Sequence, residues 1–196
     1  MRELNSTRST LDLLLSRRSV VAANITLPGP NDDELKQILS AGLRVPDHGK
    51  LAPWRIQVLG KNMRERLVAK QSSIFASERS GESPKKLELL NKTTLGSPVL
   101  LVVTSRPNSE KFEKVPLLEQ QISGGALCQN ILVAAHSMGY VGQWLTAWPA
   151  YHPEIKQCLG HSDKVDILGF IHLGSPASSP SERDRPDFQD IVSYLD

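Results

Sequence analysis

The sequence contains only two cysteines, Cys128 and Cys158, which lie far apart in a chain of 196 residues. Their spacing fits neither a paired metal site nor a disulfide framework, so we expect both to be small buried hydrophobic residues. No charge of one sign dominates, since the net charge is +2 and both signs are spread along the chain. Nucleic-acid binding usually requires a basic patch, and the sequence therefore predicts no nucleic-acid partner.

Long apolar runs are also missing. The longest of them, such as residues 98–103, are far too short to cross a bilayer, so no membrane association is expected. Residues 11–15 form an apolar run that is shorter than the core of a secretory signal and is interrupted by an acid. We therefore expect a cytoplasmic protein.

The common nucleotide-binding and catalytic motifs are absent as well. No G-x-G-x-x-G follows a strand and no G-x-x-x-x-G-K-S/T occurs, which argues against a Rossmann dinucleotide site and a P-loop. No G-x-S-x-G or H-E-x-x-H occurs either, so a serine hydrolase or a zinc protease is not expected. No two of the five histidines have the spacing of a metal site. All except His48 are interpreted as structural or surface residues, namely His136, His152, His161 and His172. The sequence predicts no metal site and no catalytic acid or base.

Hydrophobic periodicity predicts helices and strands that alternate along the chain. One helix is opened by an acidic cap at residues 31–34 and stopped by Pro46, and residues 77–86 are interpreted as a mobile loop, either a lid or a solvated excursion. Such a pattern, with helices in excess, predicts an α+β or α/β sandwich in one domain, residues 1–196. The other expected helices cover residues 10–17, 62–74, 116–138 and 151–159, the strands cover 54–59, 98–104 and 165–174, and 139–148 form a short strand or bend.

Two segments have apolar surface that points to a partner. Residues 116–138 are apolar on nearly all faces, so this helix is expected to be buried, either inside one subunit or in a dimer seam. Residues 175–196 are polar but end with Phe188, Ile191 and further apolar side chains. This composition is typical of an arm that packs on another surface, such as that of a second subunit.

Two clusters of cations lie at element boundaries. Arg17-Arg18-Ser19 follows the first helix, and residues 44–54, RVPDHGKLAPW, join the second helix to a strand. Taken singly, each has an ordinary alternative, a solvated helix end or a helix stop with a turn. The arginine fork matches phosphate geometry and helix ends leave backbone donors available, so together the clusters predict a site for a planar ligand that carries phosphate.

Four features occur in a fixed order along the chain. They are Arg17-Arg18-Ser19 at the end of the first helix, R-x-P-D-H at residues 44–48 followed by Pro53-Trp54, a Gly-x-x-Gly bend with an aromatic at Gly139, Gly142 and Trp144, and IHLGSP at residues 171–176. This set resembles the FMN-dependent nitroreductases, in their short single-domain subgroup, from about residue 11 to residue 176. The resemblance implies an α+β sandwich with a central, mostly antiparallel sheet flanked by helices. It also implies an entwined homodimer with two FMN sites at the interface.

The resemblance assigns the phosphate end of the cofactor site to the first cation cluster. Arg17 and Ser19 match contacts to the FMN phosphate and ribityl chain, with Arg18 beside them. A second phosphate cation often comes from the C-terminal segment in this family, where Arg183 and Arg185 are the candidates.

The resemblance assigns the ring end to two other segments. Arg44 and His48 match positions that reach the flavin from the neighbouring subunit. Trp144, Leu145 and Thr146 match the segment whose backbone lies along the isoalloxazine ring. A backbone N–H near Leu145 or Thr146 is the expected group that tunes the flavin, and no catalytic side chain is expected because the flavin performs the chemistry.

The activity implied is transfer of hydride from NAD(P)H to FMN and then to a nitroaromatic, quinone or similar electrophilic acceptor, by ping-pong chemistry. Two alternatives stay open. One is a flavin-binding protein that is not a reductase, such as a flavin-fragmenting, dehalogenating or sequestering relative. The other is a flavin-free dimeric structural protein on the same scaffold.

Overall fold

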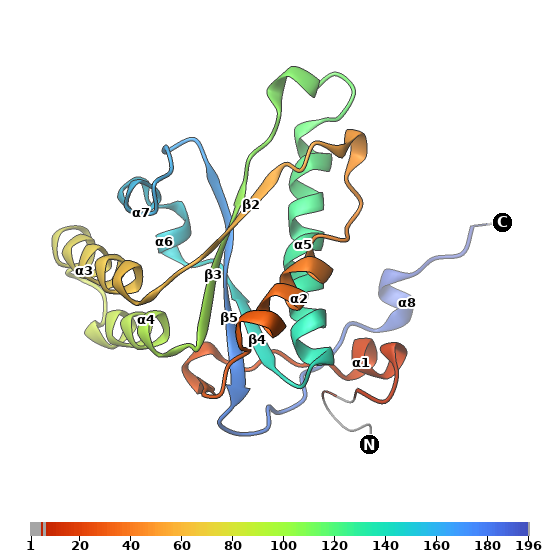
Figure 1. Ribbon diagram of the computed structural model, residues 1–196, viewed down its shortest axis with the longest axis horizontal. Coiled ribbons are helices and arrows are strands. Elements are labelled where there is room, and N and C mark those ends of the chain that lie inside the picture. Colours follow the sequence, from red (N-terminus) through yellow and green to blue (C-terminus); the bar gives the residue numbers. More distant parts are fainter. Residues whose placement is uncertain (1–4, 6, 196) are drawn as a thin grey trace.

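A single twisted sheet forms the centre of the computed structural model, which describes Asn5 and residues 7–195 (Figure 1). The strand order is β1-β5-β3-β2, with β4 also paired to β5, and each of these pairings is antiparallel. The antiparallel sheet confirms the predicted α+β sandwich and excludes the α/β alternative. The strands are β1 (Ile25–Thr26), β2 (Trp54–Val58), β3 (Val99–Ser105), β4 (Val141–Leu145) and β5 (Asp166–Pro176).

Helices cover both faces of the sheet (Figure 1). The long helix α5 (Leu117–Ser137) lies on one face with α2 (Asp32–Gly42) and α1 (Thr10–Ser16). The other face carries α3 (Lys61–Glu78), α4 (Pro84–Gly96), α6 (Trp148–Tyr151) and α7 (Pro153–Cys158). Three short 3₁₀ turns and a last short helix complete the described chain: η1 (Ala22–Asn24), η2 (His48–Lys50), η3 (Ser109–Lys111) and α8 (Phe188–Ile191).

The start of α2 shows why the predicted cap works. Asn31 Oδ1 accepts a hydrogen bond from Glu34 N–H at 2.9 Å, and Glu34 Oε2 accepts one from Asn31 N–H at 2.9 Å. This reciprocal capping box satisfies backbone donors that the first helical turn leaves unpaired. Tyr140 O–H donates to the same Glu34 carboxylate at 2.7 Å, which joins the helix start to the end of α5.

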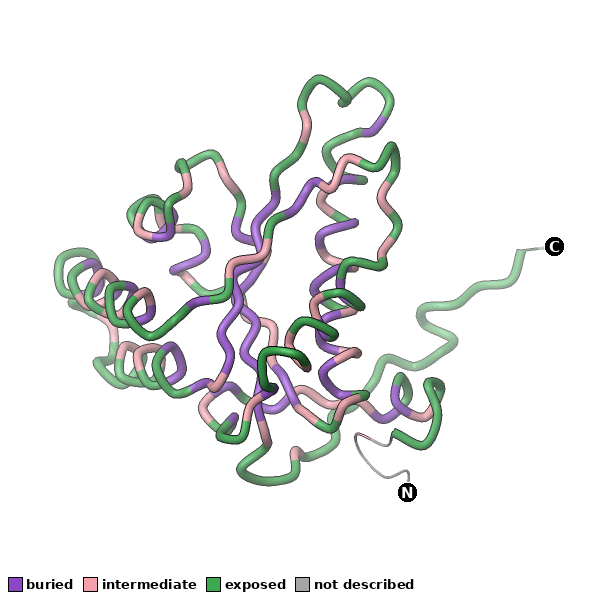
Figure 2. Tube along the Cα trace, in the orientation of Figure 1, coloured by how far each residue is buried: buried purple, intermediate pink, exposed green. Residues whose placement is uncertain are grey.

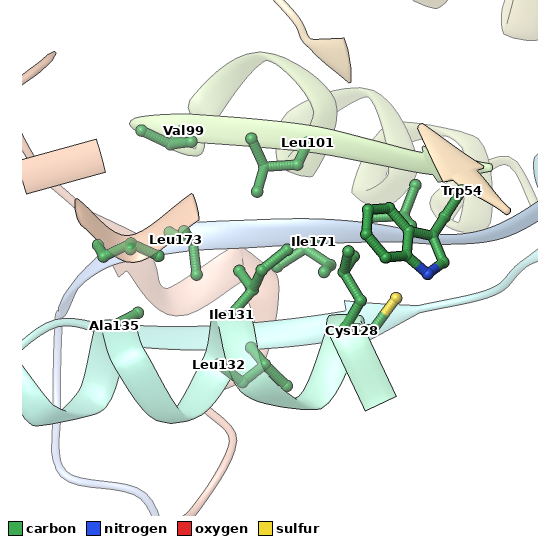
Figure 3. Packing of buried hydrophobic residues seen from close by; sticks show 12 residues of the cluster. Trp54, Val99, Leu101, Cys128, Ile131, Leu132, Ala135, Ile171 and Leu173 are labelled. Atoms are coloured by element: carbon green, nitrogen blue, oxygen red, sulfur yellow. The ribbon is translucent and has the colours of Figure 1, made fainter. Parts of the chain in front are cut away.

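Strand β3 is buried along its whole length because it separates two hydrophobic clusters. Val99, Leu101 and Val103 pack toward α5, while Leu100 and Val102 pack toward α3 and α7. Side chains of a strand alternate between faces, so one apolar run supplies both clusters. Figure 3 shows the α5 side, where Ile131 points from the helix toward β5, and Figure 2 shows the buried stretch running through the middle of the molecule.

Apolar side chains remain uncovered on the α1 and α5 side. The predicted leucine stripe of α1 is 65% exposed at Leu11, 54% at Leu14 and 53% at Leu15, whereas Leu13 is buried. Helix α5 buries only the side that faces the sheet, and Ile122 is 61% exposed. One chain therefore buries the side of α5 that faces the sheet, and it leaves apolar side chains of both helices exposed.

Three expectations about local structure are wrong. Residues 77–86 are not one loop, because α3 runs to Glu78 and α4 begins at Pro84, a residue that suits the first turn of a helix. The helix expected at 151–159 is two short helices, which meet at His152. Cys128 is buried as expected, and burial raises the pKa of its thiol to about 12, but Cys158 is partly exposed.

Candidate functional site

The predicted phosphate segment runs along the free edge of β4. Residues 17–22 connect α1 to η1, and β4 pairs with β5 alone among the strands of the sheet. Val20 N–H donates to Gly142 O at 3.3 Å, and Ala22 N–H donates to the side chain of Gln143 at 2.6 Å. These contacts hold the segment beside β4, so the two sequence motifs that the resemblance links are neighbours in space.

Arg17 is the first cation of this segment. Its Nη1 donates to Ser19 Oγ at 3.4 Å, and the residue is half-buried. Burial lowers the pKa of Arg17, and the nearby Arg185 and Arg18 lower it further. No carboxylate pairs with Arg17 among residues 5 and 7–195, so a bound anion would offset both the desolvation and the repulsion.

Arg18 differs from Arg17, because its side chain contacts the C-terminal segment. Its Nε donates to Ser181 O at 3.0 Å and lies 3.5 Å from the carboxylate of Glu182. Through this tether the tail returns to α1, and Arg185 comes near enough to affect Arg17 electrostatically. Of the two tail arginines considered from the sequence, Arg185 is therefore the one beside the cluster.

A cavity of about 340 Å³ opens two residues after Ser19. This slot lies between α4 and the end of β4, and its walls are mostly aliphatic or aromatic. Its volume is in the range of small-ligand sites. The lining residues are Val21, Ala22, Glu82, Lys86, Leu89, Leu90, Thr93, Gln143, Leu145, Ala147 and Trp148.

The predicted ring-facing residues have different orientations around the slot. Leu145 lines it, while Trp144 points to the opposite face, where its Nε1 donates to Leu168 O at 2.8 Å. Thr146 follows β4 and is exposed. Gly142 O points out of the sheet toward Val20, and alternate residues of a strand present their backbone groups to the same edge. Trp144 therefore offers a backbone N–H at the free edge, whereas that of Leu145 points toward β5.

Charged residues gather at one end of the slot. Glu82 pairs with Arg79 and with Lys86, whose Nζ lies 3.1 Å from the second carboxylate oxygen. The hydrogen bond from Lys86 is the largest cause that lowers the pKa of Glu82. The Arg79 guanidinium also lies 4.8 Å from the ring centroid of Trp148. Two cations thus surround one carboxylate, which leaves this end of the slot with an excess positive charge.

A small chamber of about 30 Å³ lies behind the slot and shares four lining residues with it. His172 lines the chamber and lies with its Nδ1 2.7 Å from Ser97 Oγ. Burial, and secondarily Arg64, lowers the pKa of His172 to about 4. The imidazole is therefore neutral at physiological pH, and His172 adds no charge to the chamber behind the slot.

Arg44 and His48 lie elsewhere in the same chain. Arg44 is exposed and its carbonyl accepts from Asn130 of α5 at 2.9 Å, while His48 Nδ1 lies 2.8 Å from Glu119 Oε2. Neither residue lines the slot. The structure thus brings Arg17, Arg18, Ser19 and the Trp144–Thr146 segment together within one chain, but not Arg44 or His48.

The loop that carries His48 has an unusual backbone. Gly49, Lys50 and Ala52 all have positive φ, at 73°, 54° and 45°. Asp47 supports this path, because its carboxylate accepts hydrogen bonds from Leu51 N–H at 3.0 Å and Ala52 N–H at 2.9 Å. Non-glycine residues with positive φ are strained and are frequent at functional sites. The backbone of this loop therefore agrees with the sequence pattern, which marks residues 44–54 as a candidate site.

The α4 wall is the part of the site that the sequence interpretation missed. Lys86, Leu89, Leu90 and Thr93 line the slot from one side of this helix. Their i, i+3, i+4, i+7 spacing is the signal that identifies such a face. The mixture of lysine and threonine with leucine concealed it.

Two features are absent from the described residues. In the described part of the chain, histidine, cysteine and acidic side chains never gather in a group of three or more that could hold a metal ion. None of the helices formed by these residues has the length and apolar character needed to cross a membrane.

Comparison with known proteins gives a consistent result. Residues 15–175 match the model of the nitroreductase family. YdjA of Escherichia coli (strain K12), which carries the provisional name NAD(P)H nitroreductase, is 31% identical over 188 residues, which cover 94% of this chain and 98% of YdjA.

Solved structures share the fold. A nitroreductase-like family protein from Bacillus cereus superposes with a TM-score of 0.82 at 21% identity, over 98% of this chain and 99% of that one. The NADPH:FMN oxidoreductase of Vibrio harveyi, solved with NAD⁺, has a TM-score of 0.71 at 18% identity over 94% of this chain and 76% of its own. The sandwich predicted from the sequence is thus the fold of these proteins. The chain belongs to the nitroreductase family.

Proposed function

We propose that this chain is an FMN-dependent oxidoreductase that uses NAD(P)H to reduce a nitroaromatic, a quinone or a similar small electrophile. When bound, FMN would supply the redox chemistry, taking hydride from NAD(P)H and passing it to the acceptor in a ping-pong cycle. Family membership and the names of the relatives support this class of reaction.

The observation that carries the proposal is the continuity between a cation cluster and an apolar slot. FMN has a phosphate at one end and a flat, largely apolar ring system at the other. Arg17 and Ser19 form the polar end, and the slot begins at Val21. A phosphate dianion satisfies guanidinium groups that otherwise repel one another, and an aliphatic slot suits a planar ring.

The residues of the slot assign separate tasks to its walls. Leu89 and Leu145 would enclose the ring from α4 and β4 and exclude water from its faces. The backbone N–H of Trp144, at the free edge of β4, would be the donor available to a ring heteroatom. Lys86 would place positive charge near the ring, an arrangement that favours electron-rich flavin.

We further propose that the working unit is a homodimer of this single domain, with residues 175–196 packing on the partner subunit. The uncovered leucines of α1, the exposed Ile122 of α5 and the exposed Phe188 and Ile191 of the tail support an apolar interface. His48 contacts Glu119, one turn from Ile122, so it borders this surface. Arg44 and His48 would then reach the slot of the partner subunit.

A visible absorption spectrum tests the function. We expect the purified protein to show flavin bands, to lose them on anaerobic addition of NADH or NADPH, and to regain them when a quinone or nitroaromatic is added. Flavin bands that neither nucleotide bleaches would identify a flavin-binding protein that is not a reductase. A colourless protein that gains no bands with added FMN would identify a flavin-free structural protein.

Dilution tests the dimer. If Arg44 and His48 complete the partner's slot, dissociation of the dimer should release FMN, seen as recovery of free-flavin fluorescence at the same concentration as the change in sedimentation. A monomer that retains its full complement of flavin would contradict the shared site.

A further inference from the structure

We propose that His136, a buried residue of α5, is a positioning residue that orients the phosphate end of the site. The inference rests on the proposed function. His136 is 1% exposed, and its Nε2 lies 3.1 Å from the carbonyl oxygen of Arg18. This contact joins the buried core of the molecule to the middle of the Arg17–Ser19 segment.

The contact with His136 fixes the direction of the peptide group that joins Arg18 to Ser19. In a trans peptide the carbonyl of Arg18 and the N–H of Ser19 point in opposite directions. Because the carbonyl is directed at His136 inside the molecule, the N–H of Ser19 is turned away from α5. Within the described residues this N–H makes no hydrogen bond. It therefore joins the Ser19 hydroxyl and the Arg17 guanidinium as a third donor for an anion.

The peptide groups on either side are fixed by other partners. Arg18 N–H donates to Asn5 Oδ1 at 2.8 Å, and Val20 N–H donates to Gly142 O at 3.3 Å. The Arg18–Ser19 peptide itself depends on His136. Without that contact the peptide can rotate, and rotation would present the Arg18 carbonyl oxygen to the anion in place of a donor.

The protonation of His136 makes the contact specific to one ring nitrogen. Its Nδ1 lies 2.7 Å from Leu132 O, so both ring nitrogens face carbonyl oxygens. Burial, the largest cause, lowers the pKa of His136, Arg17 lowers it further, and the two carbonyls oppose the shift. A neutral imidazole carries one N–H. The proposal places that proton on Nε2, which then donates to Arg18 O. The other tautomer would donate from Nδ1 to Leu132 O, and the variants below distinguish the two.

The experiment compares FMN with riboflavin, which lacks the phosphate, by fluorescence titration of the same variants. His136→Gln keeps an amide near the Nε2 position, whereas His136→Asn keeps one near Nδ1 and His136→Leu keeps neither. We expect the Asn and Leu variants to bind FMN about 5- to 30-fold more weakly and riboflavin within twofold of the unchanged protein. The Gln variant should bind both flavins nearly normally.

His161→Leu is the matched control, because His161 is a partly buried, hydrogen-bonded histidine beside β2 and distant in sequence from this segment. It should alter neither affinity. Circular dichroism and thermal melting establish whether each variant folds. If the Leu variant does not fold, the comparison of the Asn and Gln variants tests the role of His136.

Equal losses for FMN and riboflavin would overturn the proposal, because they indicate a general structural role. So would unchanged FMN affinity in the Asn variant, or a Gln variant as weak as Asn. If the unchanged protein binds FMN well but the variants show no phosphate-specific loss, this inference fails and the proposed function stands. If the unchanged protein binds neither flavin, the proposed function fails and the inference with it.

Discussion

The phosphate end and the ring slot border one another, yet they are held in place by different interactions. At the phosphate end, residues 17–22 are fixed by hydrogen bonds in which their backbone N–H groups donate to Asn5, Gly142 and Gln143, and by the contact of the Arg18 carbonyl with His136. In the slot, the lining side chains are mostly apolar and are carried by α4 and by β4, a strand at the edge of the sheet. Hydrogen bonds fix direction, whereas apolar packing fixes shape with less regard to orientation.

This difference predicts two kinds of mutant. Changes at the phosphate end should discriminate between FMN and riboflavin, because only FMN carries the group that this end recognises. Changes in the slot should weaken both flavins alike. The ratio of the two affinities is therefore the quantity that separates the regions.

The largest effect is expected from Gly169→Ala, behind the β4 wall of the slot. A Cβ on Gly169 would overlap Nε1 and Cδ1 of the Trp144 ring and lie 3.2 Å from Leu145 O. Trp144 must then move and lose its hydrogen bond to Leu168, at a cost of about 3 kcal/mol in the free energy of unfolding. Urea denaturation measures this loss, and flavin titration should show FMN and riboflavin weakened together. A loss confined to FMN would break the division between the two regions.

The second effect concerns pH and His172, which lines the chamber behind the slot. The unfolded chain protonates His172 below its ordinary pKa of 6.5, but the folded chain does not until about pH 4. The unfolded state therefore binds more protons in this window. Stability from this group is complete above pH 6.5 and falls by about 3 kcal/mol as the pH drops to about 4.

Denaturation curves at several pH values check this prediction. His172→Asn keeps a polar group near Ser97 but cannot titrate, so its stability should fall less on acidification than that of the unchanged protein. Identical pH dependence in both proteins would show that His172 is not buried in the neutral form.

The third effect is that of Arg17→Ala on the phosphate end. Removing a charge-assisted partner of the phosphate should weaken FMN binding by about 1.5–3 kcal/mol, which is at least a tenfold change in Kd, and leave riboflavin unaffected. Arg66→Ala removes an exposed arginine from α3, outside the slot, and should change neither. Unchanged FMN affinity without Arg17 would refute the assignment of this end to phosphate.

The smallest effect is expected from Leu89→Ala in the α4 wall. Leu89 lines the slot and is 52% exposed, so its truncation should remove ring contacts at little cost to folding. A loss of about 1 kcal/mol, roughly fivefold in Kd, is expected for FMN and for riboflavin. If neither affinity changes in isothermal titration, α4 does not form a wall of the flavin site.

The sequence predicts best those parts of the fold that local patterns encode. The expected helix 116–138 is α5, the expected strand 98–104 is β3, and the cap at Asn31 forms as predicted, because each depends on neighbours within a few residues. Helix α4 was missed because its lysines and threonines dilute the apolar period of a helix that is only half covered.

The arrangement of the site depends on long-range pairing that no local pattern reveals. The tether from Arg18 to Ser181 spans 163 positions, and it is what brings Arg185 to Arg17. The contact of His136 with Arg18 likewise depends on how α5 packs under the first cation cluster, and the sequence alone therefore left this histidine among the structural or surface residues. The exposed leucines of α1 show the converse, since their spacing predicts a helix without saying that one chain leaves them uncovered.

A crystal structure of the protein soaked with FMN tests the central claim most directly. The account predicts electron density for the ring between Leu89 of α4 and Leu145 of β4, with the phosphate hydrogen-bonded to the Arg17 guanidinium and to Ser19. Density for the flavin at another place on the molecule, or a ring in the slot whose phosphate points away from Arg17, would contradict it.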